Sequence, residues 1–155
     1  VVVSNTTLRI YGTHLVRYMY FIKVTADALY LGKPSDARDV LADVPKRLEI
    51  YYYLNVKAEK FRELTNEWIA KNNAPDVSAR LQPKIDELNR MYRPVSEGDR
   101  YAVTYVPGSG TELALNGRRL GVIPGAEFAS AVFSIWLGPN PVDEGLKEGL
   151  LEEDD

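Results

Sequence analysis

The sequence predicts an α+β domain in which helices cover one face of an antiparallel sheet. Three observations support this class. The first third of the chain is rich in β-branched and aromatic residues, the middle holds two amphipathic helical patterns, and the C-terminal third holds a hairpin followed by an apolar helix. Residues 1–155 are expected to form a single domain. Such a half-covered sheet commonly leaves a cleft between the sheet and its helices.

The N-terminal third is dominated by extended segments. We expect a strand at 7–11, closed by Gly12-Thr13, and a long extended region at 16–31 with a break near Asp27. A short helix capped by Ser35 or Asp36 should follow. The next strand spans residues 46–54, and both of its faces are largely apolar. We therefore expect this strand to be covered on each side.

The middle and the C-terminus contain clear helix and hairpin signals. Apolar residues recur at helical spacing over residues 56–72 and 77–92, and a strand is expected at 101–106. Asn116-Gly117 favours the type I′ turn of a β-hairpin. From Phe128 to Leu137 no helix face is charged, so this helix should be buried on most sides. Gly138 and Pro139 end it, and a short amphipathic helix is expected at 142–150.

Composition excludes several classes of function. Hydrophobic residues make up 45% and charged residues 26% of the chain, and the net charge is -3 without a basic stripe, so nucleic acid is not an expected partner. No apolar stretch approaches the roughly 20 residues of a membrane span. Cysteine is absent, which excludes disulfides and thiolate sites. His14 is the single histidine and has no second metal ligand nearby, so neither a metal nor a cofactor is expected.

Four segments, in order, resemble a bacterial chalcone isomerase-like protein: FIKVTADALYL at 21–31, PKRLEI at 45–50, GDRYAVTYVPGSG at 98–110, and LNGRRLGVIPGAEFASAVFSIWLGPNPVDEGLKEGLL at 115–151. The last segment is the most specific, because it contains three features in succession. These are the hairpin, a helix that begins with Phe-Ala-x-Ala, and the motif Ile-Trp-Leu-Gly-x-x-Pro-Val-Asp, in which that helix ends. The resemblance implies an open-faced β-sandwich, a curved antiparallel sheet covered by helices. It also implies relatives of two kinds: plant enzymes that cyclise chalcones to flavanones, and fatty-acid-binding proteins that hold a carboxylate with an arginine.

The resemblance also marks candidate site residues. Thr25 stands where the plant enzymes carry a threonine that helps to polarise the ketone, whereas Lys57 and Leu64 stand where they carry a tyrosine and an asparagine. A second enzyme threonine has no counterpart. The enzyme's polar set is therefore mostly missing, and we predict no catalytic residue.

Arg17 and Thr25 are the predicted ligand-binding residues, with Arg17 as the nearest candidate for the family's arginine and Lys23 as a rival cation. In one straight strand, residues 17 and 25 would lie about 26 Å apart. They can share a ligand only if the chain folds back between them, although residues 18–23 contain no typical turn residue. Because Lys23 lies two residues before Thr25, alternation places both on one strand face.

Two functions follow as expectations. The first is a non-catalytic binding protein that holds a fatty acid or a similar apolar anion in the cleft. The second is an intramolecular lyase or isomerase of the chalcone–flavanone type, with low or unknown activity. A structural or interaction protein whose cleft is filled by its own side chains is a third alternative. The chain begins at Val1 without an initiator methionine, which is consistent with a removed signal peptide or a trimmed chain. Relatives of this kind are often exported, which favours the periplasm over the cytoplasm.

Overall fold

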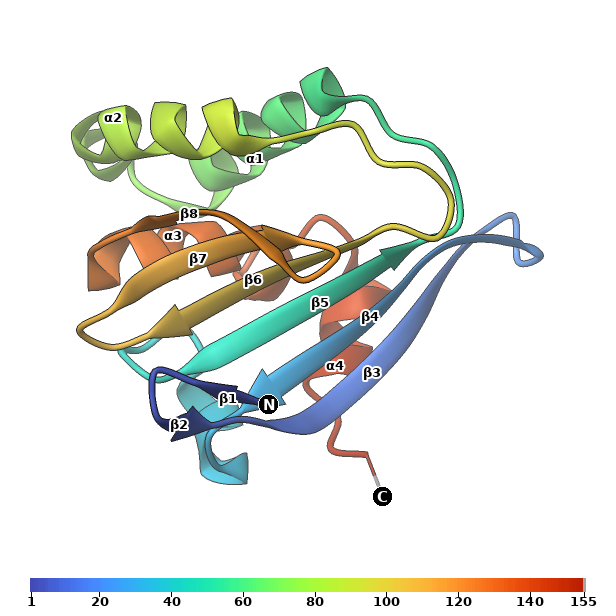
Figure 1. The fold of residues 1–155 in the computed structure, drawn as a ribbon, viewed down its shortest axis with the longest axis horizontal. Helices are drawn as coiled ribbons and strands as arrows, with labels where there is room; N and C mark the ends of the chain where they lie inside the picture. Colours follow the sequence, from blue (N-terminus) through green and yellow to red (C-terminus); the bar gives the residue numbers. More distant parts are fainter. Residues whose placement is uncertain (155) are drawn as a thin grey trace.

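The computed structural model describes residues 1–154 and contains a six-stranded antiparallel sheet, with the C-terminal helices behind it and the helices from the middle of the chain along one edge (Figure 1). The strand order is β3-β4-β5-β6-β7-β8, so every strand pairs with its neighbour in the chain. The elements are β1 (Val2–Val3), β2 (Thr6–Thr7), β3 (Arg9–Tyr18), β4 (Ile22–Leu31), η1 (Pro34–Asp39), β5 (Lys46–Tyr52), α1 (Ala58–Asn72), α2 (Pro75–Met91), β6 (Arg100–Val106), β7 (Gly110–Leu115), β8 (Arg118–Ile123), α3 (Ala126–Leu137) and α4 (Glu144–Leu150). This arrangement confirms the predicted α+β class and its open-faced sheet.

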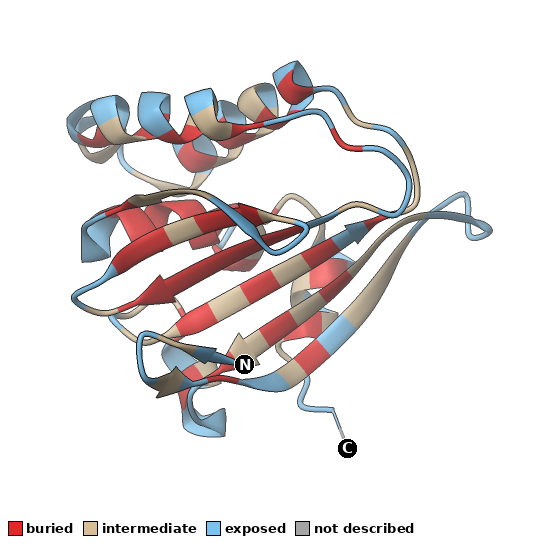
Figure 2. Cartoon of the chain, viewed as in Figure 1, coloured by how far each residue is buried: buried red, intermediate tan, exposed pale blue. Residues whose placement is uncertain are grey.

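The helices pack on the sheet and on one another. α3 contacts β7 and α1, α4 contacts β3 and β4, and α2 contacts β8. The apolar helix predicted near the C-terminus is α3, and most of its residues are buried, as Figure 2 shows. Asn116 and Gly117 have φ angles of 52° and 81°, which confirms the predicted turn between β7 and β8. Within residues 1–154, no helix combines the length and the apolar character that crossing a bilayer requires.

The first long hairpin differs from the sequence-based prediction. β3 runs without a stop through Gly12-Thr13, and β4 runs without a break through Asp27. The reversal lies at Met19-Tyr20, where both residues have positive φ angles of 52° and 67°. These are not typical turn residues, so local sequence could not locate the turn. The pairing of β3 with β4 determines the position of the turn.

The short helix before β5 also differs from its prediction. It is a 3₁₀ helix that begins at Pro34, and no side chain caps its first turn. Pro34 fixes the backbone at the helix start, which replaces the cap expected from Ser35 or Asp36.

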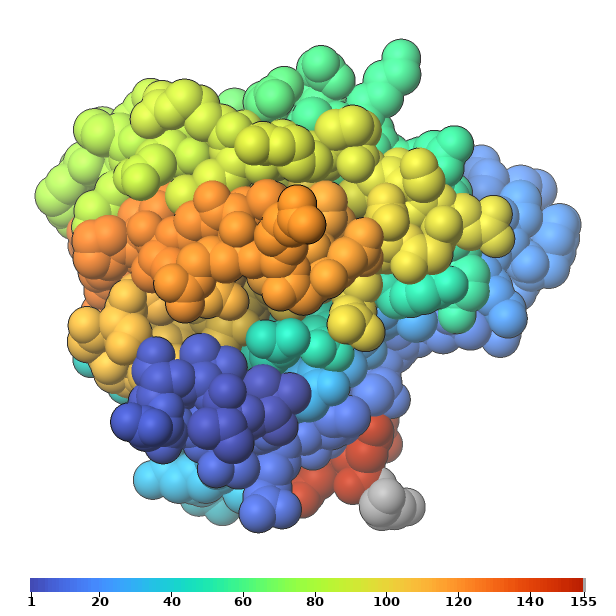
Figure 3. All heavy atoms as spheres, in the orientation of Figure 1, coloured from blue at the N-terminus to red at the C-terminus, as the bar shows by residue number. Residues whose placement is uncertain are grey.

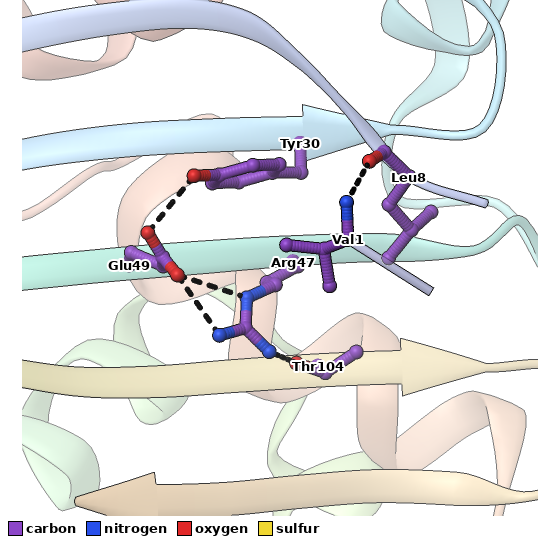
Figure 4. Close-up of polar contacts among 6 residues, drawn as sticks. All are labelled: Val1, Leu8, Tyr30, Arg47, Glu49 and Thr104. Carbon is purple, nitrogen blue, oxygen red and sulfur yellow. Dashed lines mark hydrogen bonds and ion pairs between the residues drawn. The ribbon is translucent and has the colours of Figure 1, made fainter. Parts of the chain in front are cut away.

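β5 has one buried face and one partly open face, so the prediction of cover on both sides is wrong. Leu48, Ile50 and Tyr52 are buried beneath the helices. On the opposite face, Arg47 donates to Glu49 and to Thr104, and the hydroxyl of Tyr30 donates to Glu49 at 3.0 Å (Figure 4). The polar groups satisfy one another there, which allows this face to remain open to solvent.

Candidate ligand-binding cavity

A cavity of about 540 Å³ lies between the sheet and the helices α1, α3 and α4. Its size falls within the usual range of about 300–1,000 Å³ for small-molecule sites. Most of its wall is apolar. It is lined by Val16, Val24, Thr25, Asp27, Ile50, Tyr52, Leu54, Asn55, Val56, Lys57, Lys60, Phe61, Leu64, Thr65, Tyr92, Tyr101, Val103, Leu113, Ile135, Trp136, Val142, Asp143 and Leu146.

Four aromatic rings form one wall of the cavity. Tyr52 and Tyr101 rise from the sheet, Phe61 comes from α1, and Tyr92 follows α2. Phe61 stacks on Tyr92 with ring centroids 5.5 Å apart and meets Tyr101 edge-on at 5.2 Å. Such offset and edge-on pairs stabilise beyond their buried area. The wall is therefore rigid and joins both layers of the fold.

The cavity opens where the chain enters α1. Among its lining residues, Asn55, Lys57 and Lys60 are exposed to solvent. Among the residues that the structure describes, the ammonium group of Lys60 makes one ion-pair contact, a long one of 3.9 Å to Glu63, and both side chains are exposed. Such exposed pairs contribute little energy, so the ammonium group of Lys60 can turn toward a ligand. The opening thus carries two positive charges above an apolar interior.

Asp27 introduces a carboxyl group into this apolar interior. Its side chain is only 4% exposed, and its Oδ1 atom has no hydrogen-bond partner among the described residues. Burial raises the pKa of Asp27 to about 7; the Thr25 hydroxyl lowers it, and the charge of Asp143 raises it further. Desolvation disfavours the charged carboxylate, so Asp27 is largely protonated below neutral pH.

Tyr52 and Asp143 complete the polar surroundings of Asp27. Burial raises the pKa of Tyr52 well above its ordinary value, and the nearby charge of Asp27 raises it further. Asp143 caps α4 by accepting from the backbone N–H of Leu146 at 2.8 Å. The cap holds this second carboxyl at the wall of the cavity.

The structure separates the two predicted site residues. Thr25 lines the cavity, whereas Arg17 is exposed and is not part of the lining. The chain does fold back between them, because Val16 pairs with Thr25 and Arg17 pairs with Lys23. A ligand contact for either residue stays a prediction.

A bulge explains why Lys23 and Thr25 do not share a face. The pairing of β3 with β4 shifts between Val16 and Arg17, which leaves Val24 as an extra residue on β4. An extra residue of this kind reverses the alternation of side chains beyond it. Lys23 therefore lies over the ring of Tyr53, 5.5 Å from its centroid, and lies outside the cavity lining.

The positions that carry the plant enzymes' tyrosine and asparagine do reach the cavity. Lys57 and Leu64 both line it, so the residue-by-residue match places these positions in the cavity wall. Lys57 supplies a cation and Leu64 an apolar surface in place of the enzyme's hydrogen-bonding groups. Leu64 has no polar group that could polarise a ketone.

Other tyrosines and an asparagine line the cavity, but several of their polar atoms are already engaged. The hydroxyl of Tyr92 bonds Thr65 at 2.7 Å, and that of Tyr101 donates to the backbone carbonyl of Arg93 at 2.8 Å. The side-chain oxygen of Asn55 accepts from the N–H of Glu97 at 3.1 Å. These groups hold the walls together.

Sequence reasoning missed Asp27 as a site residue, although a signal was present. Asp27 lies two residues from Thr25 and two from Leu29, in an otherwise apolar stretch of β4. Alternation alone puts these three side chains on one face. A carboxylate on the buried face of a strand is a candidate functional group, and the predicted break at this point concealed it.

Comparison with known proteins agrees with the geometry. A profile described as chalcone isomerase-like matches residues 1–152. The chain belongs to the chalcone isomerase-like family. Among solved structures, a fatty-acid binding protein of Arabidopsis thaliana has the same fold, with a TM-score of 0.72 and 14% identity over 97% of this chain and 89% of that chain. A comparison with curated protein sequences finds no match.

Proposed function

We propose that this family member binds an apolar small molecule with a carboxylate group, such as a fatty acid, in the cavity beneath the sheet. The apolar cavity with lysines at its opening carries the proposal. The plant fatty-acid binding protein of the same fold supports it. We propose that the ligand is bound and released without chemical change. The reason is that Lys57 and Leu64 stand at the positions where the plant enzymes carry a tyrosine and an asparagine.

The distribution of charge sets the orientation of the ligand. Lys57 and Lys60 at the opening attract the carboxylate, and the aromatic wall takes the chain. In the register of the sheet, Asp27 pairs with Ile50 and Thr25 with Tyr52, and the segment leading to Lys57 follows the end of β5. Asp27 thus lies deeper than Thr25, at the end that receives the ligand's tail. A protonated Asp27 tolerates that tail better than an ionised one.

The first prediction tests occupancy of the cavity. In Leu64→Trp the indole fills space that the ligand needs, so the affinity for a long-chain fatty acid should fall about 100-fold or more, equivalent to about 2.7 kcal/mol. Isothermal titration calorimetry measures this change. Ala70→Trp, an exposed site on the same helix, is the matched control and should bind like the parent protein. An absence of affinity for fatty acids of any chain length in the parent protein contradicts the proposed function.

The second prediction tests the head group. Lys57→Gln combined with Lys60→Gln should weaken fatty-acid binding about tenfold and leave binding of the matching fatty alcohol unchanged, because only the acid carries a charge for the lysines to attract. Lys71→Gln, farther along α1, is the control. Arg17→Ala in the same assay tests the sequence-based assignment of Arg17. Equal losses for the acid and the alcohol argue against a carboxylate at the opening.

A second candidate is an intramolecular lyase or isomerase, and the placement of Thr25 and Asp27 favours it. Both line the cavity, and a carboxyl whose pKa is about 7 suits proton transfer near neutral pH. A chalcone cyclisation assay decides between the candidates, with Thr25→Ala and Asp27→Asn as controls. A rate equal to the uncatalysed reaction eliminates this candidate. Export to the periplasm remains part of the proposal, and cell fractionation of the full-length product tests it.

A further inference from the structure

The tip of the β3–β4 hairpin, residues 17–23, exposes large apolar side chains at the end of a projecting ribbon. Tyr20 is 93% and Phe21 77% exposed, and Tyr18, Met19 and Ile22 are also exposed. Figure 1 shows the hairpin extending beyond the rest of the sheet, and in the space-filling view of Figure 3 its tip projects at the edge of the molecule. A contiguous exposed apolar group of this kind marks an interaction surface.

Three features of this tip are unfavourable in water. Its apolar side chains are solvated, although burial of each would be favourable. Met19 and Tyr20 adopt positive φ angles of 52° and 67°, where glycine or asparagine would be less strained. Arg17 and Lys23 are direct cross-strand partners, and like charges in that position repel. Features that break local rules together indicate a function outside the fold itself.

We propose that the β3–β4 tip docks on a lipid bilayer that carries anionic headgroups. Tyrosine and phenylalanine side chains favour the interface between headgroups and acyl chains, so Tyr18, Tyr20 and Phe21 fit that depth. Arg17 and Lys23 flank them at the level of the headgroups, where anionic lipids relieve their mutual repulsion. Within residues 1–154, neither cation has an ion-pair partner. Charge complementarity therefore selects an anionic bilayer as the partner.

The hairpin also connects this surface to the cavity. Val16, Val24 and Thr25, which line the cavity, lie within a few residues of the tip on the same two strands. Docking through the tip places one wall of the cavity close to the lipid surface. The docking itself does not require that the cavity hold a ligand, so the two proposals are tested separately.

The first experiment measures binding to vesicles by flotation. The parent protein should float with vesicles of phosphatidylcholine mixed with phosphatidylglycerol, more weakly at high salt, and little with phosphatidylcholine alone. Tyr20→Ser combined with Phe21→Ser should lower binding about tenfold or more, because two interfacial aromatic groups are lost. Ile10→Ser, at a 53% exposed apolar residue of β3 away from the tip, is the matched control and should bind normally.

The second experiment separates the tip cations from net charge. Arg17→Gln combined with Lys23→Gln should lower binding to the anionic vesicles about 30-fold, since each near-surface cation contributes about fivefold. Arg9→Gln combined with Lys33→Gln changes the net charge equally at exposed positions outside the tip and should have little effect. Equal losses in the two double variants contradict docking through the tip.

The third experiment locates the contact. The chain contains no cysteine, so Tyr20→Cys and Ile10→Cys each provide a single site for an environment-sensitive fluorophore. Anionic vesicles should raise and blue-shift the emission from position 20 and leave that from position 10 unchanged. An unresponsive probe at position 20 overturns the proposal. So does self-association in solution that Tyr20→Ser with Phe21→Ser abolishes, which would assign the tip to a second copy of the chain.

Discussion

Replacing Asp27 by asparagine is expected to stabilise the protein by about 4 kcal/mol at pH 8 and to have little effect at pH 4. Asp27 is 4% exposed, and burial is the main cause that raises the pKa of its carboxyl from 3.8 to about 7. Each tenfold change in proton affinity corresponds to about 1.36 kcal/mol. Asparagine keeps the shape of the side chain and removes the charge that must be desolvated at high pH.

The direction of the pH dependence follows from proton binding. Because the folded state holds the proton of Asp27 more tightly than the unfolded state, the stabilisation is fully present below pH 3.8 and is lost as pH rises to about 7. Urea denaturation of the parent protein and of Asp27→Asn across this range measures the difference. Asp86→Asn, at an exposed position of α2, is the control and should not alter the profile. Parallel profiles for the parent and Asp27→Asn would show that Asp27 titrates normally.

The same substitution bears on the proposed ligand. Ionisation of Asp27 places a negative charge in the cavity, which repels a carboxylate and disfavours an apolar tail. Fatty-acid affinity of the parent protein should therefore weaken as pH rises through about 7. In Asp27→Asn that decrease should be absent. Titration calorimetry at several pH values on both proteins gives the comparison.

Replacing Phe133 by alanine is expected to cost about 3–5 kcal/mol, the usual range for a buried phenylalanine. Phe133 is fully buried in α3. Its ring also lies 5.4 Å from Nζ of Lys46, a fully buried lysine that donates to the carbonyl of Ala42 at 2.8 Å. Loss of the ring leaves a void and removes a favourable face from a charge that burial already disfavours.

The unfolding midpoint in urea and the Tm should both fall in Phe133→Ala. Phe21→Ala makes the same chemical change at a side chain that is 77% exposed, and it should leave stability in water nearly unchanged. A small effect for Phe133→Ala would mean that the neighbouring side chains collapse into the space. A large effect for Phe21→Ala would mean that the hairpin tip packs against the body.

Patterns along the chain were sufficient to predict most of the fold. The apolar helix α3 was predictable because its residues 128–137 leave no polar face, and the turn at Asn116-Gly117 because those residues tolerate positive φ. Thr25, which the resemblance to the family's strand motif singled out, lies in the cavity lining, and its contact with a ligand stays a prediction. These signals are local, so they can be interpreted without knowing which other elements each segment contacts.

Long-range pairing decided what the sequence could not. The turn at Met19-Tyr20 has no local signature and exists because β3 pairs with β4. The bulge at Val24 places Lys23 and Thr25 on opposite faces of the sheet, whereas simple alternation predicts that they share one face. A shift of one residue moves a side chain to the other face of a sheet, and its energy depends on partners distant in the chain.

The chain by itself therefore determined the family, the order of helices and strands from residue 46 onward, and the absence of thiol chemistry. Only the tertiary structure decided that Asp27 is buried in the cavity, that Arg17 lies outside its lining, and that the apolar residues 18–22 are exposed at a tip. Burial and charge environment are properties of the assembled layers. Propensity and periodicity report which element a segment forms, whereas desolvation depends on what the folded chain packs around each group.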